Sequence, residues 1–567
     1  MGIWVHVEFL RVQSFLFAVP RLKVMLGANA ALGETIRLRL PVCAAEVAAG
    51  DAATRPELTL PNAIENDPLS IVVSQVGRKQ SVDTTLEPDN PQDLWRQYAV
   101  ISRDGGHFEA WFANREQADK FSLKARQLIS TALPGLRFKI EYDPESVLAQ
   151  GATDTDTDND TAAFATLPVF QVCEHSGVYP AHHKKADEDD VTEGGDYASD
   201  LVKILEDKGK AFAAHETHDI IGLLSGDLPL ASLQAPLDLN ELCGNGYLAV
   251  IHADGNGVGN LRLEYLKGLP TPPEEKSVAE KEASERFFHG LRVANRIAVK
   301  AALAKTFNDA ATIGFKSRPY QLLMLGGDDL LMICQARFAL PFLRSYAEHL
   351  RDNQPKTLPK DQVLSFAAGV TIARASVPFY QLQHLTEALA SSAKVQARSL
   401  DCKVSTVDWM VHSFSWADDP MAGRLQGQQS NTAKPYRILK EETATQIEQA
   451  DDQATTDQET VQKAGQPPAS LEEILDLAAA LQNSEVKETL ARSQLRYLRS
   501  VFPQGRRLSE LALLELPKAL KDRLKAYAKA AEADGCGFGS LADVIEVYEI
   551  ERLGVTIRAK DKEQADE

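Results

Sequence analysis

The sequence predicts an α+β protein in which two segments repeat the order β-α-β-β-α-β, the ferredoxin-like plan, and a helical segment follows them. The first repeat lies in 1–146 and the second in 244–415, where short apolar strands alternate with amphipathic helices. Polar stretches at 151–162 and about 420–468 separate these segments from their neighbours. With 567 residues, the chain has room for three or four domains, each with its own core.

Composition and charge narrow the class of protein. The chain holds 61 Lys and Arg against 80 Asp and Glu, a formal net charge of −19, which argues against a surface that coats nucleic acid by itself. No apolar run reaches the roughly 18 residues that a membrane-spanning helix needs, so we expect no membrane association. The six cysteines are scattered and form no CxxC pair, so we expect no disulfide framework and a reducing, cytoplasmic setting.

The first segment, 1–146, begins with a strand whose apolar residues alternate at Ile3, Val5 and Val7, as a single buried face requires. The later elements that we expect are strands at 69–74, 107–112 and 136–142, a helix at 115–132, and helical sequence with a small-residue patch at 27–34. Glu8 lies near the first strand, but this segment has no glycine hairpin with paired acids to face it. We therefore expect this domain to be structural and not catalytic.

Two segments do not follow this order. Residues 163–243 are mixed and partly helical, and we expect them to form a linking domain. Residues 469–555 are helical, with amphipathic runs near both ends. They predict a C-terminal helical domain.

A carboxylate followed by glycines stands at the end of a strand in the segment 244–415. The apolar run YLAVI is typical of a central strand covered on both faces, and it ends in HADGNGVGN. Asp254 thus lies at the strand end, and Gly255, Gly257 and Gly259 follow it. Glycines allow backbone N–H groups to approach an anion closely, although the same residues also suit a tight turn.

A hairpin in the same segment supplies two more carboxylates. Two apolar strands, YQLLML and LLMI, are separated only by Gly326, Gly327, Asp328 and Asp329. We expect the glycines to supply the positive φ values of a tight turn. Any hairpin tolerates Gly and Asp, but two adjacent acids beside an apolar sheet are costly unless a cation compensates their charge. Paired carboxylates that face a third on Asp254 are the oxygen ligands that Mg²⁺ uses in phosphoryl transfer.

Basic residues near this site have two interpretations each. The helix predicted at 280–305 has an apolar face, and its other face holds Arg286, Arg292 and Arg296. These side chains could reach phosphates, but we expect a solvated helix face. Lys394, in a later helix, could hold a triphosphate as a point charge or could lie at the surface as an ordinary lysine.

These motifs resemble a known family. HADGNGVG, LGGDDLLMI and FAAGVTIARASVPFYQLQHLTEALASSAK at 366–394 are similar to the second palm domain of the large, polymerase-like subunit of type III CRISPR effector complexes, the Cmr and Csm large subunits. Residues 7–32 and 105–140 resemble the first palm domain of that family, and 540–553 resembles its C-terminal helical domain. The resemblance implies that both β-α-β-β-α-β segments are palm domains related to nucleotide cyclases.

The resemblance also implies an activity. It is that of a target-RNA-activated nucleotidyltransferase, which converts ATP with Mg²⁺ or Mn²⁺ into cyclic oligoadenylate or a related adenylate messenger. Asp254, Asp328 and Asp329 match the catalytic metal ligands of the family. The nucleotide-binding residues that we expect are Gly255, Asn256, Gly257, Gly259, Gly326, Gly327 and Lys394. The implied partners are a small subunit and RAMP-type backbone subunits, and we expect them to hold most of the guide and target RNA because this chain is acidic.

The sequence departs from the family at three places. Asn256 replaces the second acid of a DGD motif, and its carbonyl could still coordinate a metal. Cys173, His175, His182 and His183 lie where the family often has a zinc ribbon, but without paired cysteines we expect a remnant that binds no zinc. We expect no N-terminal HD nuclease domain, because the first palm begins the sequence. Two other functions stay open: a catalytically silent scaffold of the RNA-guided complex, and a free-standing nucleotide cyclase.

Overall fold

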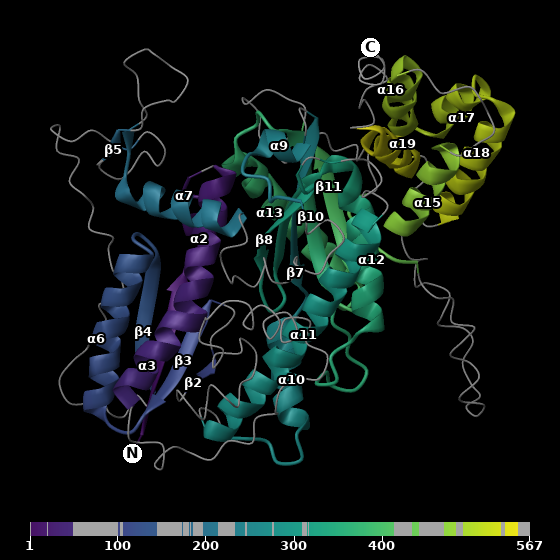
Figure 1. Cartoon of the computed structure of the whole chain (residues 1–567). Coiled ribbons are helices and arrows are strands. Elements are labelled where there is room, and N and C mark those ends of the chain that lie inside the picture. Colours follow the sequence, from purple (N-terminus) through teal and green to yellow (C-terminus); the bar gives the residue numbers. More distant parts are fainter. Residues whose placement is uncertain are drawn as a thin grey trace, which may run out of the picture.

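The fold consists of two sheet domains and a group of C-terminal helices (Figure 1). The computed structural model describes residues 2–19, 21–48, 100–102, 106–143, 173, 181, 183–184, 197–213, 233–243, 246–274, 277–308, 315, 317–412, 434–440, 470–482, 492–533 and 539–553. These parts confirm the α+β class that the sequence predicts, while the domain boundaries stay predictions. Among the described residues, no helix has the length and apolar character needed to cross a membrane.

The N-terminal sheet has four antiparallel strands in the order β2-β3-β1-β4. They are β1 (Ile3–Leu10), β2 (Val100–Ser102), β3 (His107–Phe112) and β4 (Arg137–Asp143). This order, with helices between β1 and β2 and between β3 and β4, is the ferredoxin-like plan that the sequence predicts. The strand expected at 69–74 lies outside the described residues, and β2 is the second strand of the plan.

Helices cover one face of this sheet because alternate residues of its strands are apolar. The helices of the domain are α1 (Val12–Leu16), α2 (Leu22–Glu34), the π-helical turn Thr35–Arg39, α3 (Leu40–Ala48) and α6 (Arg115–Ala132). Val5 and Val7 of β1 are fully buried. Phe121 of α6 fills the same core, with its ring 4.9 Å from that of Phe112 and 5.8 Å from that of Phe108.

The linking region packs on the first domain through a close contact between two helices. Its described elements are β5 (His183–Lys184), β6 (Tyr197–Ala198), α7 (Asp200–Ala213) and α9 (Leu239–Cys243). A Cβ added at Gly27 of α2 would lie 1.7 Å from the carbonyl oxygen of Leu205 in α7. A Cβ added at Gly209 of α7 would lie 1.8 Å from a carbonyl oxygen of α2. The small-residue patch at 27–34 therefore allows the two helix backbones to touch.

The zinc-ribbon remnant is described only in part. Cys173 is fully buried, and His183 lies on the short strand β5. His175 and His182 lie outside the described residues. The expectation that no zinc binds here stays a prediction.

The central sheet repeats the plan and extends it. Its strands are β7 (Tyr247–Gly255), β8 (Tyr320–Leu325), β9 (Leu330–Gln335), β10 (Phe366–Arg374), β11 (Thr406–Val411) and β12 (Tyr436–Arg437). The order is β12-β11-β10-β7-β9-β8, and only β10 and β11 are parallel. The four strands β10-β7-β9-β8 form the predicted β-α-β-β-α-β unit, and β11 and β12 widen it at one edge.

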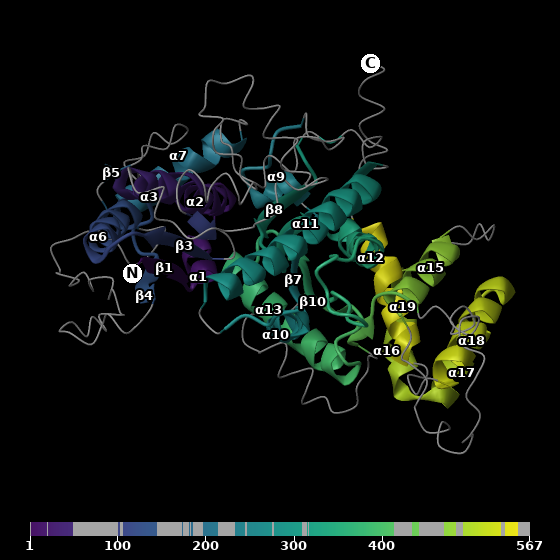
Figure 2. The same ribbon diagram turned by 90° about the horizontal axis from the view of Figure 1, so that it is seen from below.

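Helices lie on both faces of the central sheet (Figure 2). They are α10 (Val258–Gly268), α11 (Val278–Asn308), α12 (Ala336–Asp352) and α13 (Phe379–Ser399). Thr386 of α13 bonds Thr371 of β10 at 2.8 Å, whereas the Tyr346 ring of α12 stacks on that of Phe366 in the same strand. Because residues five apart on a strand point to opposite faces, α12 and α13 cover opposite faces of the sheet.

The first domain contacts the central domain through α11. Lys281 of α11 forms an ion pair with Glu109 of β3. The Lys281 ammonium also lies 5.3 Å from the ring centroid of Trp4 in β1. Trp4 and Trp111 form a small buried cluster on this face, against which Val278 packs. The face of the N-terminal sheet that is not covered by the helices of its own domain thus lies against the start of α11.

The C-terminal helices attach to the β11–β12 edge through a buried ionic cluster. These helices are α15 (Leu471–Gln482), α16 (Arg492–Val501), the 3₁₀ turn Phe502–Gln504, α17 (Arg506–Leu514), α18 (Lys518–Ala533) and α19 (Gly539–Arg552). Glu546 of α19 pairs with Lys434 and Arg499 and accepts a hydrogen bond from Trp409 Nε1 at 3.0 Å. Burial opposes its charge, but Lys434 and Arg499 outweigh that effect and hold the pKa of Glu546 below its usual value.

Candidate metal and nucleotide site

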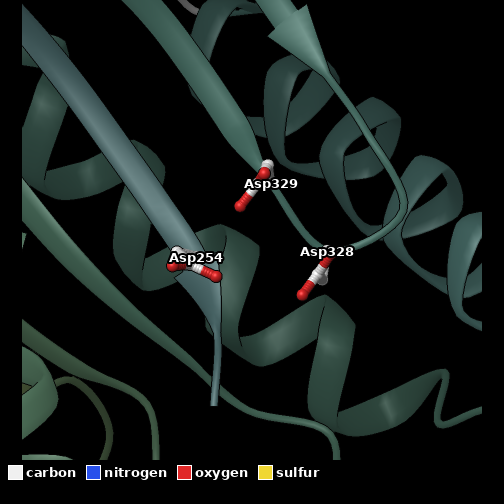
Figure 3. A group of neighbouring side chains, drawn as sticks. All are labelled: Asp254, Asp328 and Asp329. Carbon is white, nitrogen blue, oxygen red and sulfur yellow. The ribbon is translucent and has the colours of Figure 1, made fainter. Parts of the chain in front are cut away.

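Asp254 lies at one edge of the central sheet, beside the hairpin between β8 and β9. The register of β7 and β9 pairs Ala253 with Leu330. Asp329 directly precedes Leu330, so the register places it across from Asp254. Figure 3 shows the carboxyl groups of Asp254, Asp328 and Asp329 directed into one shared space from the end of β7 and from the hairpin.

The three acids form a cluster that can hold a cation. One potential ligand oxygen from each of Asp254, Asp328 and Asp329 lies within 4.8 Å of the others, and all three residues are half-buried. Among the described residues, no other group of three His, Cys, Asp or Glu residues has this geometry. The hairpin is closed by the backbone N–H of Gly326, which donates to the carbonyl of Asp329 at 2.8 Å. The structure thus brings together the three carboxylates that the sequence indicates.

The hairpin glycines do not play the conformational role expected of them. The described glycines with positive φ are Gly106, Gly135, Gly257 and Gly505, so the prediction for Gly326 and Gly327 is wrong. A four-residue loop can turn without a left-handed residue, unlike the two-residue turns that require one. A Cβ added at Gly327 would meet only the side chain of Arg292, at 3.7 Å.

The glycines after β7 serve two different purposes. A Cβ at Gly255 would lie 2.7 Å from Asp328 Cβ and 3.0 Å from Asp328 Oδ2, so this position must be Gly for the hairpin to approach. Gly257 has φ +65° and directly precedes α10. Open space lies where a Cβ would stand at Gly257 and Gly259. That space suits an anion approaching the backbone at a helix N-terminus, and nucleotide binding there stays a prediction.

Asn256 is anchored within the protein. It is buried, and its Nδ2 donates to Ser365 Oγ at 2.8 Å. Its backbone N–H donates to the Ser365 carbonyl at 2.9 Å, and Ser365 Oγ donates to the carbonyl of Cys402 at 2.7 Å. These bonds fix the loop that follows Asp254. Metal coordination by the Asn256 carbonyl stays a prediction.

The electrostatics of the cluster favour a cation. Burial raises the pKa of Asp328 to about 6, and the negative charge of Asp254 contributes. Burial also raises the pKa of Asp329 to about 8, with further contributions from the charges of Asp328 and Asp254. Asp328 and Asp329 therefore hold protons more tightly than usual, because like charges crowd a partly desolvated site. A divalent cation would replace those protons.

Lys394 lies against the acids and not at the open surface. It comes from α13, and its ammonium pairs with the carboxylate of Asp254. Three ionised carboxylates against one ammonium leave two negative charges. Oxygen ligands with that net charge fit Mg²⁺ or Mn²⁺, so the residues present suit the metal that the family resemblance implies.

Two of the three α11 arginines differ from the expectation of a solvated face. Arg292 and Arg296 are 5% and 0% exposed. Arg292 pairs with Glu285, which is also buried, and approaches His289 Nδ1 at 3.2 Å. The physical reason is that α11 packs against α10, α12 and β2, so less of it faces solvent than one apolar stripe indicates. Arg286 is half-buried and pairs with Glu282 at 2.6 Å.

The sequence did not indicate two residues beside the hairpin. Asn295 of α11 donates through Nδ2 to the carbonyl of Gly327 at 3.2 Å. Tyr346 of α12 donates its hydroxyl hydrogen to Asn295 Oδ1 at 2.5 Å. Both residues are 1% exposed. The available signal was a polar Asn beside the apolar face of a long helix, which by itself does not show what the side chain contacts.

Comparison with known proteins agrees with the geometry of the central domain. Residues 247–400 match the family model described as Cas10/Cmr2, second palm domain. A search of curated proteins finds no match.

Solved structures resemble the whole chain more distantly. The structure titled "Crystal structure of Csm1-Csm4 cassette in complex with cA4" has 12% identity and a TM-score of 0.45, with coverage of 97% of this chain and 70% of that chain. The Csm1–Csm4 cassette with pppApApA has 11% identity and a TM-score of 0.44, and covers 97% and 69%. Csm1 of T. onnurineus has 12% identity and a TM-score of 0.35, and covers 96% and 69%. Because these TM-scores are below 0.5, the likeness to a known family rests on the match of residues 247–400.

The fold and the site together define a palm-type protein with a three-carboxylate site at a GGDD hairpin. Residues 247–400 match the second palm domain of the Cas10/Cmr2 family, so this part of the chain is Cas10-like. This confirms the resemblance that the HADGNGVG and LGGDDLLMI motifs indicate.

Proposed function

We propose that this chain is the cytoplasmic large subunit of a type III CRISPR RNA-guided antiviral effector complex. Its second palm domain is a divalent-cation-dependent nucleotidyltransferase that converts ATP into cyclic oligoadenylate or a related adenylate messenger. The observation that carries the proposal is the cluster of Asp254, Asp328 and Asp329 within 4.8 Å, inside a Cas10/Cmr2 second palm domain. A purely architectural palm would not need three crowded acids at a cost in stability.

The reaction class follows from the donor set. In nucleotidyl transfer, the 3′-hydroxyl oxygen of one nucleotide bonds to the α-phosphorus of an ATP as the α–β phosphoanhydride bond breaks. Pyrophosphate leaves with the bonding electrons, and the hydroxyl proton passes to solvent. Bound Mg²⁺ or Mn²⁺ would stabilise charge on the attacking and leaving oxygens.

The side chains of this protein would bind and orient the reactants. Asp254, Asp328 and Asp329 would hold the cation, and all three must be ionised to do so. Lys394 pairs with Asp254 in the structure, and its ammonium would be free to contact a triphosphate once a cation takes that carboxylate. The backbone N–H groups near Gly257, at the start of α10, would contact phosphate oxygens.

RNA control would come through partner subunits. The chain has a formal net charge of −19, so the guide and target RNA would be held mainly by a small subunit and RAMP-type backbone subunits. A target-dependent activity requires that RNA favour the competent palm arrangement over the resting one. About a hundredfold activation corresponds to roughly 2.7 kcal/mol of differential binding.

The test is incubation of the purified full-length chain with labelled ATP and Mg²⁺ or Mn²⁺. It is run with the chain alone, and with the products of the neighbouring genes and target RNA. We expect a labelled adenylate product only with target-loaded partners, and none when Asp328 and Asp329 are both replaced by Ala in a complex that still assembles. No product under any condition would favour a silent scaffold. Equal rates with and without partners would favour a free-standing cyclase.

A further inference from the structure

Tyr346 connects the two strand ends that carry the acids. Its ring lies 4.3 Å from the Phe366 ring, with an angle of 18° between the planes. Phe366 begins β10 and is the register partner of Gly255, the residue that follows Asp254. The ring of Tyr346 is therefore packed against the strand pair that carries Asp254.

The hydroxyl of Tyr346 reaches the hairpin on the other side. It donates to Asn295 Oδ1 at 2.5 Å, and Asn295 Nδ2 donates to the Gly327 carbonyl at 3.2 Å. Gly327 directly precedes Asp328 in the hairpin. The Gly327 carbonyl can only accept, so it requires the nitrogen of the Asn295 amide to face the hairpin and leaves the amide oxygen to accept from Tyr346.

A core role alone does not explain this choice of residues. Phenylalanine would fill the space of the Tyr346 ring without a buried hydroxyl, and leucine would suit the Asn295 position in an apolar helix contact. The pKa of Tyr346 is raised by burial and, in addition, by the negative charges of Asp328 and Asp329, so the phenol stays a hydrogen-bond donor beside the acids. The Tyr346 hydroxyl and the Asn295 amide instead form a chain of two hydrogen bonds that ends at the Gly327 carbonyl of the hairpin.

We propose that Tyr346 and Asn295 are positioning residues that hold the GGDD hairpin at the distance from Asp254 at which one cation can bind all three acids. The inference rests on the proposed function of this site, which it deepens. Neither residue touches the cation or the nucleotide. Their effect passes through the Gly327 carbonyl to the backbone of Asp328.

The experiment measures Mn²⁺ binding to the full-length chain by the loss of the free-ion signal in electron paramagnetic resonance. Tyr346→Phe keeps the ring stack and removes the hydroxyl. Asn295→Leu removes both hydrogen bonds that the side-chain amide makes, to Tyr346 and to the Gly327 carbonyl. We expect each change to raise the Mn²⁺ Kd about fivefold or more, the effect of one buried hydrogen bond. The double variant should bind no more weakly than Asn295→Leu alone, because the two side chains act in one chain of bonds.

The matched control is Tyr436→Phe. Tyr436 is also fully buried and donates its hydroxyl hydrogen at 2.7 Å, but to Asp543 at the contact with α19. We expect Tyr436→Phe and Tyr346→Phe to lower the midpoint temperature of thermal unfolding by similar amounts, whereas only Tyr346→Phe weakens Mn²⁺ binding. Asn295→Leu provides the same readout if Tyr346→Phe does not fold.

Two outcomes separate this inference from the proposed function. If Asp328→Ala weakens Mn²⁺ binding and neither Tyr346→Phe nor Asn295→Leu does, the cation site stands and the positioning role is overturned. An equal loss of affinity in Tyr436→Phe would also overturn it, because the effect would then be general loss of stability. If Asp328→Ala leaves Mn²⁺ binding unchanged, the cation site of the proposed function fails, and the inference fails with it.

Discussion

Replacing Asp329 by asparagine tests the charge crowding at the site in the absence of any ligand. The pKa of Asp329 is raised from an ordinary value of 3.8 to about 8 in the folded protein. Between these two values the folded state holds a proton that the unfolded chain releases. Stability therefore falls as pH rises through this window, since the native state binds more protons than the unfolded state. An asparagine side chain has no such proton to lose, so the variant lacks this dependence.

The magnitude follows from proton linkage. A difference of one bound proton changes the free energy of unfolding by about 1.4 kcal/mol for each pH unit, which gives an upper value of about 4 kcal/mol between pH 5 and 8. Because the carboxyl group is only half-buried, water shares the charge, and we expect a loss of about 2 kcal/mol. A divalent cation at a hundred times its Kd would restore about 2.7 kcal/mol in the wild type alone.

The assay is hydrogen exchange of the β9 amides, corrected for the intrinsic pH dependence of exchange. Without divalent cations, the protection of wild-type β9 should fall about 30-fold between pH 5 and 8, the equivalent of about 2 kcal/mol. Asp329→Asn should keep only the shallower fall that the remaining Asp328 contributes, because the pKa of Asp328 is raised to about 6, and should be flat above about pH 7; Mg²⁺ should restore protection only in the wild type. Parallel pH profiles for the two proteins would refute the reasoning.

Three further changes test how the site and the domains are held. Gly255→Ala should raise the Mn²⁺ Kd at least tenfold, because its Cβ would lie 2.7 Å from that of Asp328; an unchanged titration would contradict the steric argument. Gly27→Ala should cost about 2–3 kcal/mol where α2 touches α7, seen as faster proteolysis of the linking region, and equal rates would count against it. Glu546→Gln should cost about 3 kcal/mol because it removes a buried carboxylate that pairs with both Lys434 and Arg499, and leaves Lys434 with Asp543 at 3.5 Å. Hydrogen exchange of α19 should rise, and unchanged protection would show that the ionic cluster does not hold the tail.

Local patterns in the sequence were sufficient to predict the order of the strands and helices in the two sheet domains and the three acids of the candidate site. Alternation at Ile3, Val5 and Val7 predicts a buried face of β1, and the structure confirms that face, although Trp4 on the other face is also buried, against α11. Asp254 and the Asp328–Asp329 pair each lie at the end of an apolar strand, and the pairing of β7 with β9 brings these acids together. Because β7 and β9 are neighbours in the plan, their ends must meet.

The features that the sequence did not indicate depend on contacts between distant segments. The bond from Asn295 to the hairpin requires the position of α11, and the bond from Tyr346 requires α12 as well. Burial of Arg292 depends on how many elements surround α11, which a single helical face does not reveal. The contact between Gly27 and α7 is another case, because a small-residue patch does not indicate which helix packs against it.

The most direct test of the central claim is anomalous scattering from crystals of the full-length chain grown with Mn²⁺ and a non-hydrolysable ATP analogue. The account predicts manganese between Asp254, Asp328 and Asp329, with Lys394 turned from Asp254 towards the triphosphate. Manganese and nucleotide bound elsewhere, or Lys394 still paired with Asp254 beside an empty carboxylate cluster, would contradict it.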